Sequence, residues 1–400
     1  MINNYLKTIN GFIGNSIHSG IKYKNLDLAV IYSETPCIAA GSFTTNKTVA
    51  APVIISREKI KNSIQAIIVN SGNANAVTGN QGIKDGNRMC DLISEQLKIN
   101  SDSVLVSSTG VIGVKLPMEK IENGISKLKN TLSEENLNKV PKGIMTTDTF
   151  EKKGNISFFI EDEEIIINGM GKGSGMIHPN MATMLGFMIT NINISRELMQ
   201  EALSEVVDKT YNMISVDGDT STNDMVILLS NQNAKHSLIE EKNDDYKKFL
   251  NALYELAEFL AIEIARDGEG ATKLLKVDLI NAKSLKDAKI LAKAIITSSL
   301  VKSAFFGEDA NWGRVLSSLG ASGAQMDPNR VGLIFKSSFG EIELMKNGEP
   351  LVFNEKVASK ILSDSEIEIK VNMNDGKFNA KSWGCDLTYD YVKINAEYRS

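Results

Sequence analysis

The sequence predicts a mixed α/β protein of two domains, a main domain at residues 1–280 and a smaller α+β domain at residues 281–400. At 400 residues the chain is long for a single hydrophobic core. Along the first two thirds, short apolar runs typical of buried strands alternate with helical patterns of apolar residues. The last third contains predicted helices and strands of its own, and we therefore expect it to fold as a separate unit.

The predicted elements of the main domain are short strands and helices in alternation. Strands are predicted at residues 28–33, 38–44, 66–70, 104–107, 156–160, 164–168, 184–189 and 225–230, and helices at 85–97, 117–128, 195–210 and 244–265. The strand at 66–70 leads into the polar, glycine-rich segment 71–82, which is either a multi-turn connection or a wall of a ligand site. In the smaller domain, helices are predicted at 286–303 and after 313, and strands at 331–336, 340–344, 367–373 and 385–397.

The composition is that of a soluble globular protein, because 42% of the residues are hydrophobic. The 44 Lys and Arg against 49 Asp and Glu give a formal net charge of −5, which argues against a nucleic-acid-binding protein. Cys37, Cys90 and Cys385 form no CxxC pair and indicate a reducing compartment. The N-terminus lacks the apolar core of a signal peptide, and no run approaches the roughly 20 apolar residues of a membrane helix. We expect a cytoplasmic protein without membrane or nucleic-acid partners.

The chain is organised around residues 169–191, which read GMGKGSGMIHPNMATMLGFMITN. Glycines at every second position from Gly169 to Gly175 allow a loop that passes close to a ligand. The spacing excludes a phosphate-binding P-loop, because glycine rather than serine or threonine follows Lys172. The segment 217–228 begins like a calcium-binding loop but lacks the glycine and the final acid that such a loop requires. We therefore predict no metal site.

Ala182 and Thr183 stand where the glycine loop meets a predicted buried strand, and Thr183 is the candidate nucleophile. A hydroxyl nucleophile needs a partner that accepts its proton. Of the three histidines, His18 and His236 are expected at the surface, whereas His178 lies in the central loop and is an alternative base. If the chain cuts itself before Thr183, the new α-amine has a pKa of about 8 and lies beside the hydroxyl, where it can accept the proton. The alternative is that Thr183 is only the first residue of a strand.

Acyl chemistry also requires hydrogen-bond donors for the oxyanion that develops. Thr109 and Gly110 follow a predicted buried strand and offer a hydroxyl and a backbone N–H. Lys172 can bind a substrate carboxylate and Glu269 a substrate ammonium, although each is also explained as a solvated loop charge. The residues by themselves point to an acyl-transfer enzyme that acts on a small zwitterion.

Several segments, in the same order along the chain, resemble the blocks of one family. They are GFIGNSIHSGIKYKNLDLAVI, AAGSFTTNKTVAAPV, VNSGNANAVTGNQG, SSTGVIG, MTTDT, KGSGMIHPNMATML, SVDGDTSTNDM, ARDGEGATK, FFGEDANWGR and INAEYRS. The family is that of the ornithine acetyltransferases of arginine biosynthesis, also called glutamate N-acetyltransferases. Because the blocks span the chain nearly end to end, the resemblance favours Thr183 as the nucleophile.

The resemblance implies a cut between Ala182 and Thr183 into an α chain, 1–182, and a β chain, 183–400, which stay associated. It also implies that Thr183 takes the acetyl group of N2-acetyl-L-ornithine as an ester and passes it to L-glutamate in a ping-pong cycle. Thr109 and Gly110 match the oxyanion hole of the family. The positions that match substrate-binding residues are Thr146, Lys172, Thr183, Glu269, Asn395 and Ser400. In the MTTDT block, Thr147 and Thr149 are alternatives to Thr146, and Ser400 stands where the family pattern usually has threonine.

The implied fold is the α/β/β/α sandwich that the family shares with self-processing aminopeptidases, and the implied assembly is an α2β2 heterotetramer. No cofactor is expected, and acetyl-CoA is a second acetyl donor that the sequence neither requires nor excludes. Two other hypotheses stay open. One is a hydrolase or aminopeptidase of the related fold, which would pass the acyl group to water, and the other is a binding protein without catalysis.

Overall fold

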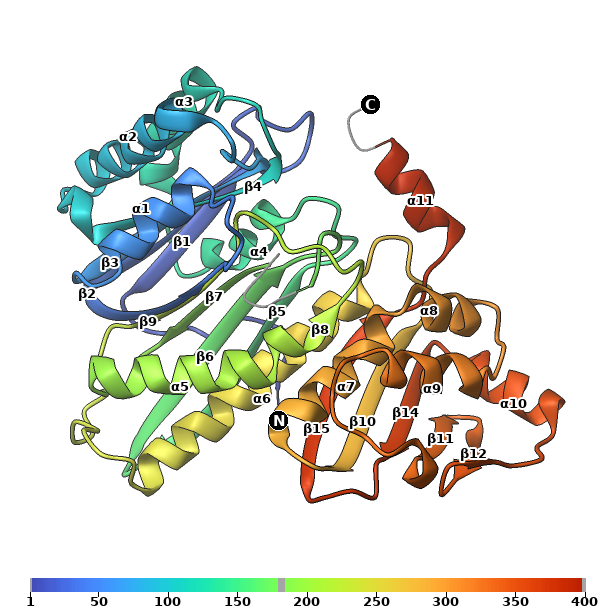
Figure 1. Cartoon of the computed structure of the whole chain (residues 1–400). Coiled ribbons are helices and arrows are strands. Elements are labelled where there is room, and N and C mark those ends of the chain that lie inside the picture. Colours follow the sequence, from blue (N-terminus) through green and yellow to red (C-terminus); the bar gives the residue numbers. More distant parts are fainter. Residues whose placement is uncertain (1, 179–183, 398–400) are drawn as a thin grey trace. The chain divides into compact units, whose positions relative to one another are not determined.

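The computed structural model describes residues 2–178 and 184–397, which form two compact units (Figure 1). The described residues of the first unit are 2–173, 184–208 and 219–260, and those of the second are 174–178, 209–218 and 261–397. Each unit therefore takes segments from both sides of the central glycine loop. The domain boundary at residue 280 stays a prediction.

The first unit is built on an eight-stranded mixed sheet of order β4-β3-β2-β9-β7-β6-β5, in which β1 also pairs with β2. The strands are β1 (Phe12–Ile17), β2 (Leu28–Phe43), β3 (Ile64–Asn73), β4 (Val104–Val111), β5 (Lys152–Ile160), β6 (Glu163–Lys172), β7 (Leu185–Thr190) and β9 (Met225–Ser230). The helices are α1 (Ala51–Lys59), α2 (Gly79–Leu97), α3 (Met118–Leu128), α4 (Val140–Ile144), α5 (Arg196–Lys209) and α6 (Asp244–Arg266). Short 3-10 turns lie at Ser101–Ser103, Lys129–Thr131 and Asn136–Lys139.

Strand β2 joins the two halves of this sheet. Its residues 28–32 pair with β3, whereas residues 38–43 pair with β9. The sequence predicts two neighbouring strands here, but the structure has one long strand whose pairing register shifts between Tyr32 and Cys37. Pro36 lies in this interval, and proline has no amide N–H with which to continue a ladder. The interruption lets one half of the sheet fold over the other.

The first unit is an α/β/β/α sandwich, as the resemblance implies. One apolar cluster contains Ile67 of β3 together with Phe187 of β7 and Ile227 of β9, and therefore lies between the two sheet layers. The next residue of β3, Ile68, belongs to a second cluster with Met89 of α2, because successive side chains of a strand point to opposite faces. Helices α5 and α6 cover the outer face of the other layer (Figure 1).

The second unit contains a seven-stranded mixed sheet of order β13-β12-β11-β14-β10-β15-β8. Its strands are β8 (Ile214–Ser215), β10 (Leu274–Ala282), β11 (Gly332–Ser337), β12 (Gly340–Lys346), β13 (Glu349–Pro350), β14 (Glu366–Asn372) and β15 (Phe378–Cys385). Its helices are α7 (Leu285–Thr297), α8 (Ser299–Phe306), α9 (Trp312–Gly320), α10 (Glu355–Leu362) and α11 (Tyr389–Ala396), with 3-10 turns at Tyr211–Met213 and Pro328–Arg330. Ser382 Oγ of β15 donates a hydrogen bond of 2.8 Å to the carbonyl oxygen of Ala292, which packs α7 on this sheet.

Two predicted elements of the second unit are wrong. The single helix predicted at 286–303 is two helices, because Ser298 ends α7 and its side chain caps α8 by accepting from the Val301 N–H. A strand is predicted at 385–397, but the observed strand β15 already ends at Cys385. The helix α11 follows it, with Thr388 as its N-cap. Since none of the residues of α11 is buried, the alternation of apolar and polar residues there reflects no core face.

The structure describes no helix, in residues 2–178 and 184–397, that is long and apolar enough to cross a membrane.

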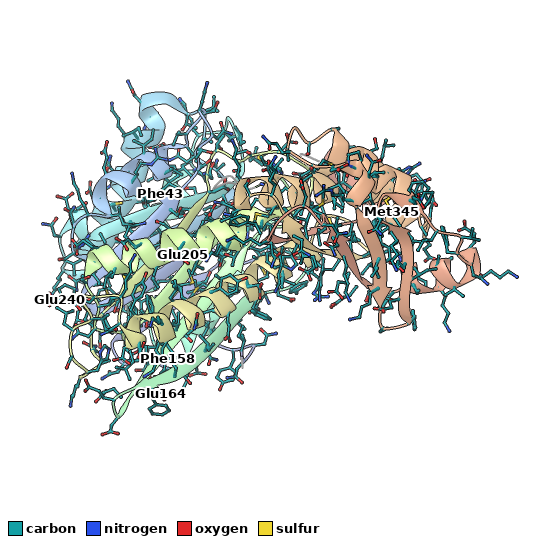
Figure 2. The ribbon with its side chains drawn as sticks, turned by 60° about the horizontal axis from the view of Figure 1, so that its bottom comes forward. Phe43, Phe158, Glu164, Glu205, Glu240 and Met345 are labelled. Atoms are coloured by element: carbon teal, nitrogen blue, oxygen red, sulfur yellow. The ribbon has the colours of Figure 1, made fainter. Side chains whose placement is uncertain are left out.

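The core assignment predicts a large difference between two phenylalanines of the first unit. Phe187 is fully buried between the layers, whereas Phe159 is 61% exposed on the hairpin of β5 and β6, where Phe158 and Glu164 are labelled in Figure 2. Phe187→Ala should lower the free energy of unfolding by about 3–5 kcal/mol, and Phe159→Ala by less than about 1 kcal/mol. Denaturant unfolding followed by circular dichroism measures both, and equal losses would contradict the layer assignment.

Candidate active site

The ends of β3 and β4 place the predicted oxyanion residues where two strands approach closely. Gly110 is paired with Gly72 across the parallel ladder, and its φ is +132°, a value that side-chain-bearing residues rarely adopt. A Cβ atom at Gly110 would overlap the backbone of Gly72 and Asn73. The chain therefore requires glycine here, next to the hydroxyl of Thr109.

The structure brings Lys172 to Thr109, although 63 residues separate them in the sequence. Lys172 is the last residue of β6, and its Nζ donates a hydrogen bond of 3.3 Å to Thr109 Oγ1. Both residues are at least nine-tenths buried. Two residues that the sequence singled out independently thus lie together at the strand ends of the first unit.

Sequence reasoning missed Asp148, a buried carboxylate within the MTTDT block. Its Oδ1 accepts hydrogen bonds of 2.7 Å from Lys152 Nζ and from the Gly173 N–H, and its Oδ2 accepts one of 2.9 Å from the Thr146 N–H. Asp148 thereby ties the block that contains Thr146 to Gly173, which directly follows β6. The predicted glycine loop is partly wrong, because its first two glycines, Gly169 and Gly171, belong to β6 and pair in its ladders. The sequence signal for it is a single acid in a block whose other members are three threonines and a methionine.

The charges around Asp148 keep its carboxylate ionised. Burial alone would raise the pKa of Asp148, but the ammonium groups of Lys172 and Lys152, with the hydrogen bonds from Lys152 and the Thr146 N–H, hold it well below its usual range. The side chains of Asp148 and Lys152 are both fully inaccessible to water. The choice among Thr146, Thr147 and Thr149 as the substrate-binding threonine stays a prediction.

The second unit contains another pair of the predicted residues. Asn395 on α11 donates a hydrogen bond of 2.8 Å from Nδ2 to Glu269 Oε2, and a second one of 3.0 Å to the carbonyl oxygen of Tyr391. Glu269 is 7% exposed. A Cβ atom at Gly175 would overlap the Glu269 carboxylate, so this glycine of the central loop leaves room for the acid.

The segment 174–178 of the central loop is firmly held within the second unit. The carboxylate of Asp217 accepts hydrogen bonds from the backbone N–H groups of Met176 (2.5 Å) and Ile177 (2.9 Å). Val216 donates its N–H to the carbonyl oxygen of Ile177, and Ser174 donates its hydroxyl to the carbonyl oxygen of Asp267. The chain is thus fixed up to a few residues before the predicted cut.

The histidines are poor candidates for a general base. Burial, with the nearby Lys293 ammonium, lowers the pKa of His178 to about 4, so its imidazole is neutral and weakly basic at pH 7. Its Nδ1 lies 3.1 Å from Ser215 Oγ. The surface position expected for His236 is wrong, because this residue is 3% exposed and its Nε2 accepts from the Asn193 N–H. His18 is partly exposed and lies 3.3 Å from Asp27.

Three predicted residues, Ala182, Thr183 and Ser400, lie outside the described residues. Among residues 2–178 and 184–397 the structure has no group of three or more His, Cys, Asp or Glu side chains that could hold a metal ion.

The first unit is an α/β/β/α sandwich in which a hydroxyl, a glycine and a lysine meet at the end of β4, an arrangement suited to acyl transfer. The ArgJ family model matches residues 14–400, and the chain belongs to the ArgJ family. It is 51% identical over 386 residues to the arginine biosynthesis bifunctional protein ArgJ 1 of Clostridium acetobutylicum, covering 96% of this chain and 95% of that protein. It is 50% identical over 395 residues to the protein ArgJ of Thermotoga neapolitana, covering 98% and 99%.

A solved structure of the same family supports the fold. The crystal structure of the arginine biosynthesis bifunctional protein ArgJ of Bacillus halodurans shares 42% sequence identity with this chain at a TM-score of 0.51. The match covers 53% of this chain and 98% of the solved one.

The backbone of Gly110 lies close to the backbone of Gly72 and Asn73. We therefore expect a substitution of Gly110 to lower activity far more than the same substitution of a nearby glycine that has free space around it. Gly113 also has a positive φ, of +81°, but a Cβ atom there would meet nothing within 4 Å. Gly110→Ala should displace the predicted oxyanion N–H and lower the rate of acetyl transfer at least about 100-fold, whereas Gly113→Ala should lower it less than about threefold. Initial rates on protein with unchanged circular dichroism measure this, and equal rates for both variants would remove Gly110 from the site.

The buried ion pair of Asp148 and Lys152 predicts that loss of the carboxylate destabilises the fold. Asp148→Asn leaves the Lys152 ammonium buried without its carboxylate and should lower the free energy of unfolding by about 3–5 kcal/mol at pH 7. Lys153→Gln, which breaks the partly exposed ion pair with Glu151, should lower the free energy of unfolding by less than about 1 kcal/mol.

The same carboxylate gives the sign of the pH effect. Because the folded pKa of Asp148 lies below the unfolded value of about 3.9, its stabilisation is complete above that pH and is lost as the pH falls toward the folded pKa. Urea unfolding between pH 7 and pH 3 should therefore show a steeper loss for the wild type than for Asp148→Asn. Parallel curves would contradict the assignment.

Proposed function

We propose that the protein is a glutamate N-acetyltransferase of arginine biosynthesis, which transfers the acetyl group of N2-acetyl-L-ornithine to L-glutamate and releases L-ornithine. The observation that carries the proposal is the Lys172–Thr109 contact at the end of β4 beside Gly110, in a chain of the ArgJ family. This arrangement puts a cation for a substrate carboxylate next to two donors for an oxyanion.

The nucleophile is generated by the chain itself. The hydroxyl of Thr183 attacks the carbonyl carbon of Ala182, the peptide C–N bond breaks to leave an ester, and water hydrolyses that ester. Thr183 then carries a free α-amine with a pKa of about 8. The weak basicity of His178 supports this amine, rather than an imidazole, as the proton acceptor.

In the first half-reaction the Thr183 hydroxyl attacks the acetyl carbonyl of acetylornithine and gives its proton to the α-amine. Thr109 Oγ and the Gly110 N–H stabilise the oxyanion. The C–N bond breaks, ornithine leaves with the proton, and the acetyl group stays on Thr183 as an ester. In the second half-reaction the amine of glutamate attacks this ester by the reverse sequence of proton transfers.

The remaining predicted residues bind the substrate. Lys172 binds a carboxylate, Glu269 binds the side-chain ammonium of the ornithine moiety, and the Asn395 amide orients the Glu269 carboxylate through their hydrogen bond of 2.8 Å. Thr146 and Ser400 add hydroxyl donors. No metal or cofactor takes part in these steps.

Acetyl-CoA is proposed as a second acetyl donor to glutamate, since the relatives at 50–51% identity are called bifunctional. Release of free thiol from acetyl-CoA in the presence of glutamate tests this. We also propose that the α and β chains assemble as an α2β2 heterotetramer in the cytoplasm. Light scattering of the purified protein measures the mass of the assembly.

The mechanism predicts that processing and transfer both depend on the hydroxyl of Thr183. Thr183→Ala should leave a single chain near the full mass of 43.7 kDa and abolish ornithine release, whereas Thr183→Ser should retain cleavage and measurable transfer. Intact mass, N-terminal sequencing and an ornithine assay measure these outcomes.

Three results would contradict the proposal in different ways. An uncut but fully active Thr183→Ala variant would reject the mechanism. Ornithine release from the wild type at the same rate without glutamate would favour the hydrolase. An uncut and inactive wild type would favour a binding protein.

A further inference from the structure

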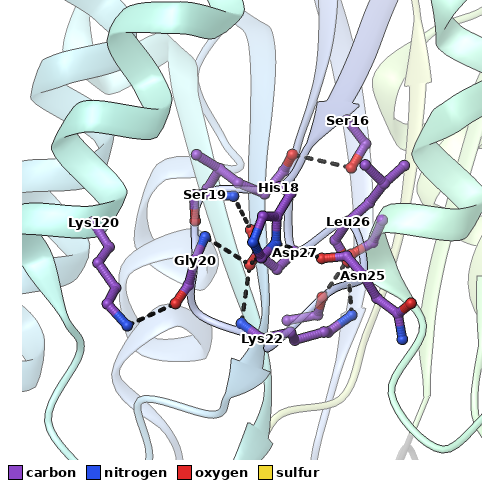
Figure 3. Close-up of polar contacts among 12 residues, drawn as sticks. Ser16, His18, Ser19, Gly20, Lys22, Asn25, Leu26, Asp27 and Lys120 are labelled. Carbon is purple, nitrogen blue, oxygen red and sulfur yellow. Dashed lines mark hydrogen bonds and ion pairs between the residues drawn. The ribbon is translucent and has the colours of Figure 1, made fainter.

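The loop of residues 18–27, which connects β1 to β2, is organised around one buried carboxylate (Figure 3). Asp27 has no solvent exposure, and its carboxylate accepts hydrogen bonds from the backbone N–H groups of Ser19 (2.6 Å), Gly20 (3.1 Å) and Lys22 (3.0 Å). Three backbone donors on one carboxylate hold the loop in one conformation. The loop therefore presents the side chain of Lys22 in a defined place.

Lys22 reaches the elements that hold the predicted site of the first unit. Its stem packs on Gly72, where an added Cβ atom would lie 3.1 Å from Lys22 Cγ. Gly72 is the ladder partner of Gly110. The Lys22 ammonium donates to the carbonyl oxygens of Leu26 (2.9 Å) and Met145 (2.5 Å), and Met145 directly precedes Thr146. Lys22 thus touches the neighbours of both the oxyanion pair and the substrate-binding threonine.

Two of the three N–H groups of this ammonium have acceptors within the described part of the chain, so one is available for a ligand. Lys22 is also only partly buried. Burial lowers the pKa of Lys22 to about 8, with Asp27 raising it and Lys172 lowering it. A cation that is partly desolvated and repelled by a second lysine gains from an anion placed between them.

The local charges leave a positive excess for such an anion. The ammonium groups are those of Lys22, Lys152 and Lys172, and the carboxylates are those of Asp27 and Asp148. Asp27 is engaged by the backbone of its own loop, and Asp148 is engaged by Lys152 and two backbone N–H groups. Three cations against two carboxylates favour binding of a monoanionic group.

We propose that Lys22 is a further substrate-binding residue, which binds with Lys172 the α-carboxylate that acetylornithine and glutamate have in common. This inference rests on the proposed function. In acetylornithine the α-carboxylate is bonded to the same carbon as the acetamido nitrogen, so it lies beside the carbonyl that enters the oxyanion hole. We place this carboxylate next to the Lys22 ammonium because the Lys22 stem packs against Gly72, the strand neighbour of Gly110. One carboxylate site then serves both half-reactions.

The test compares donors with and without the α-carboxylate. Lys22→Met keeps most of the stem and removes the charge. It should lower kcat/KM for acetylornithine about 10- to 100-fold, mainly through KM, and should also raise KM for glutamate. For N-acetylputrescine, which is acetylornithine without the carboxylate, the same substitution should change kcat/KM less than about threefold. Inhibition constants of ornithine and putrescine give the same comparison where turnover of the shorter donor is slow.

A matched control distinguishes the loss of the Lys22 charge from a displacement of the loop of residues 18–27. Lys120 on α3 donates from Nζ to the carbonyl oxygen of Gly20 (2.7 Å) and so holds the same loop from the other side (Figure 3). Lys120→Met should change neither donor more than about threefold. Lys22→Gln, which removes the charge but retains a hydrogen-bond donor on the side chain, serves if Lys22→Met does not fold.

Each outcome decides a separate question. A loss of equal size for both donors would mean that Lys22 only supports the structure, and no loss for acetylornithine would mean that it binds no carboxylate. Intact mass of each variant shows whether the cut before Thr183 is retained, so that a processing defect is not taken for a binding defect. A wild type that transfers no acetyl group from acetylornithine to glutamate overturns the proposed function itself.

Discussion

The candidate site of the first unit depends on the buried carboxylate of Asp148. This one group accepts hydrogen bonds from the amide of Thr146, the amide of Gly173 and the ammonium of Lys152. It therefore fixes the relative position of two loops that are distant in the sequence. Its negative charge also offsets part of the repulsion between the ammonium groups of Lys152 and Lys172 nearby. The two loops and the lysines form a single electrostatic arrangement.

Most strands of the first unit could be predicted from the sequence, because they are short apolar runs that end in polar residues. The strand β1 was not predicted, and the long strand β2 was predicted as two strands. The predicted strand at 184–189 and helix at 244–265 correspond to β7 and α6, whose patterns are strong and local. Thr109, Gly110 and Lys172 could also be singled out from the sequence, since each comes after a predicted buried strand. The meeting of Thr109 with Lys172 was not, because strand order is a non-local property that no local pattern encodes.

The sequence does not reveal the role of a residue when that role depends on contacts with residues far away in the chain. Asp148 and Lys22 look like ordinary charged loop residues until the partners of their side chains are known. His236 looked exposed because it stands in a polar stretch, yet its ring accepts from a backbone amide inside the unit. The helix α11 was hidden by an accidental alternation of residues, and only its cap at Thr388 marks where it begins.

The anchoring of residues 174–178 bears on how the two halves of a cleaved molecule stay together. These residues would form the tail of the α chain, yet the Asp217 carboxylate, the Val216 amide and the Asp267 carbonyl bind them inside a unit that otherwise belongs to the β chain. Two chains of which one contributes a segment to the folded unit of the other are not expected to separate on dilution alone. If the cut occurs, the two chains also share the sheet of the first unit, where β7 and β9 of the β chain pair with β6 and β2 of the α chain. They would separate only when that sheet unfolds, so the lifetime of the pair would be set by an unfolding rate and not by a dissociation constant.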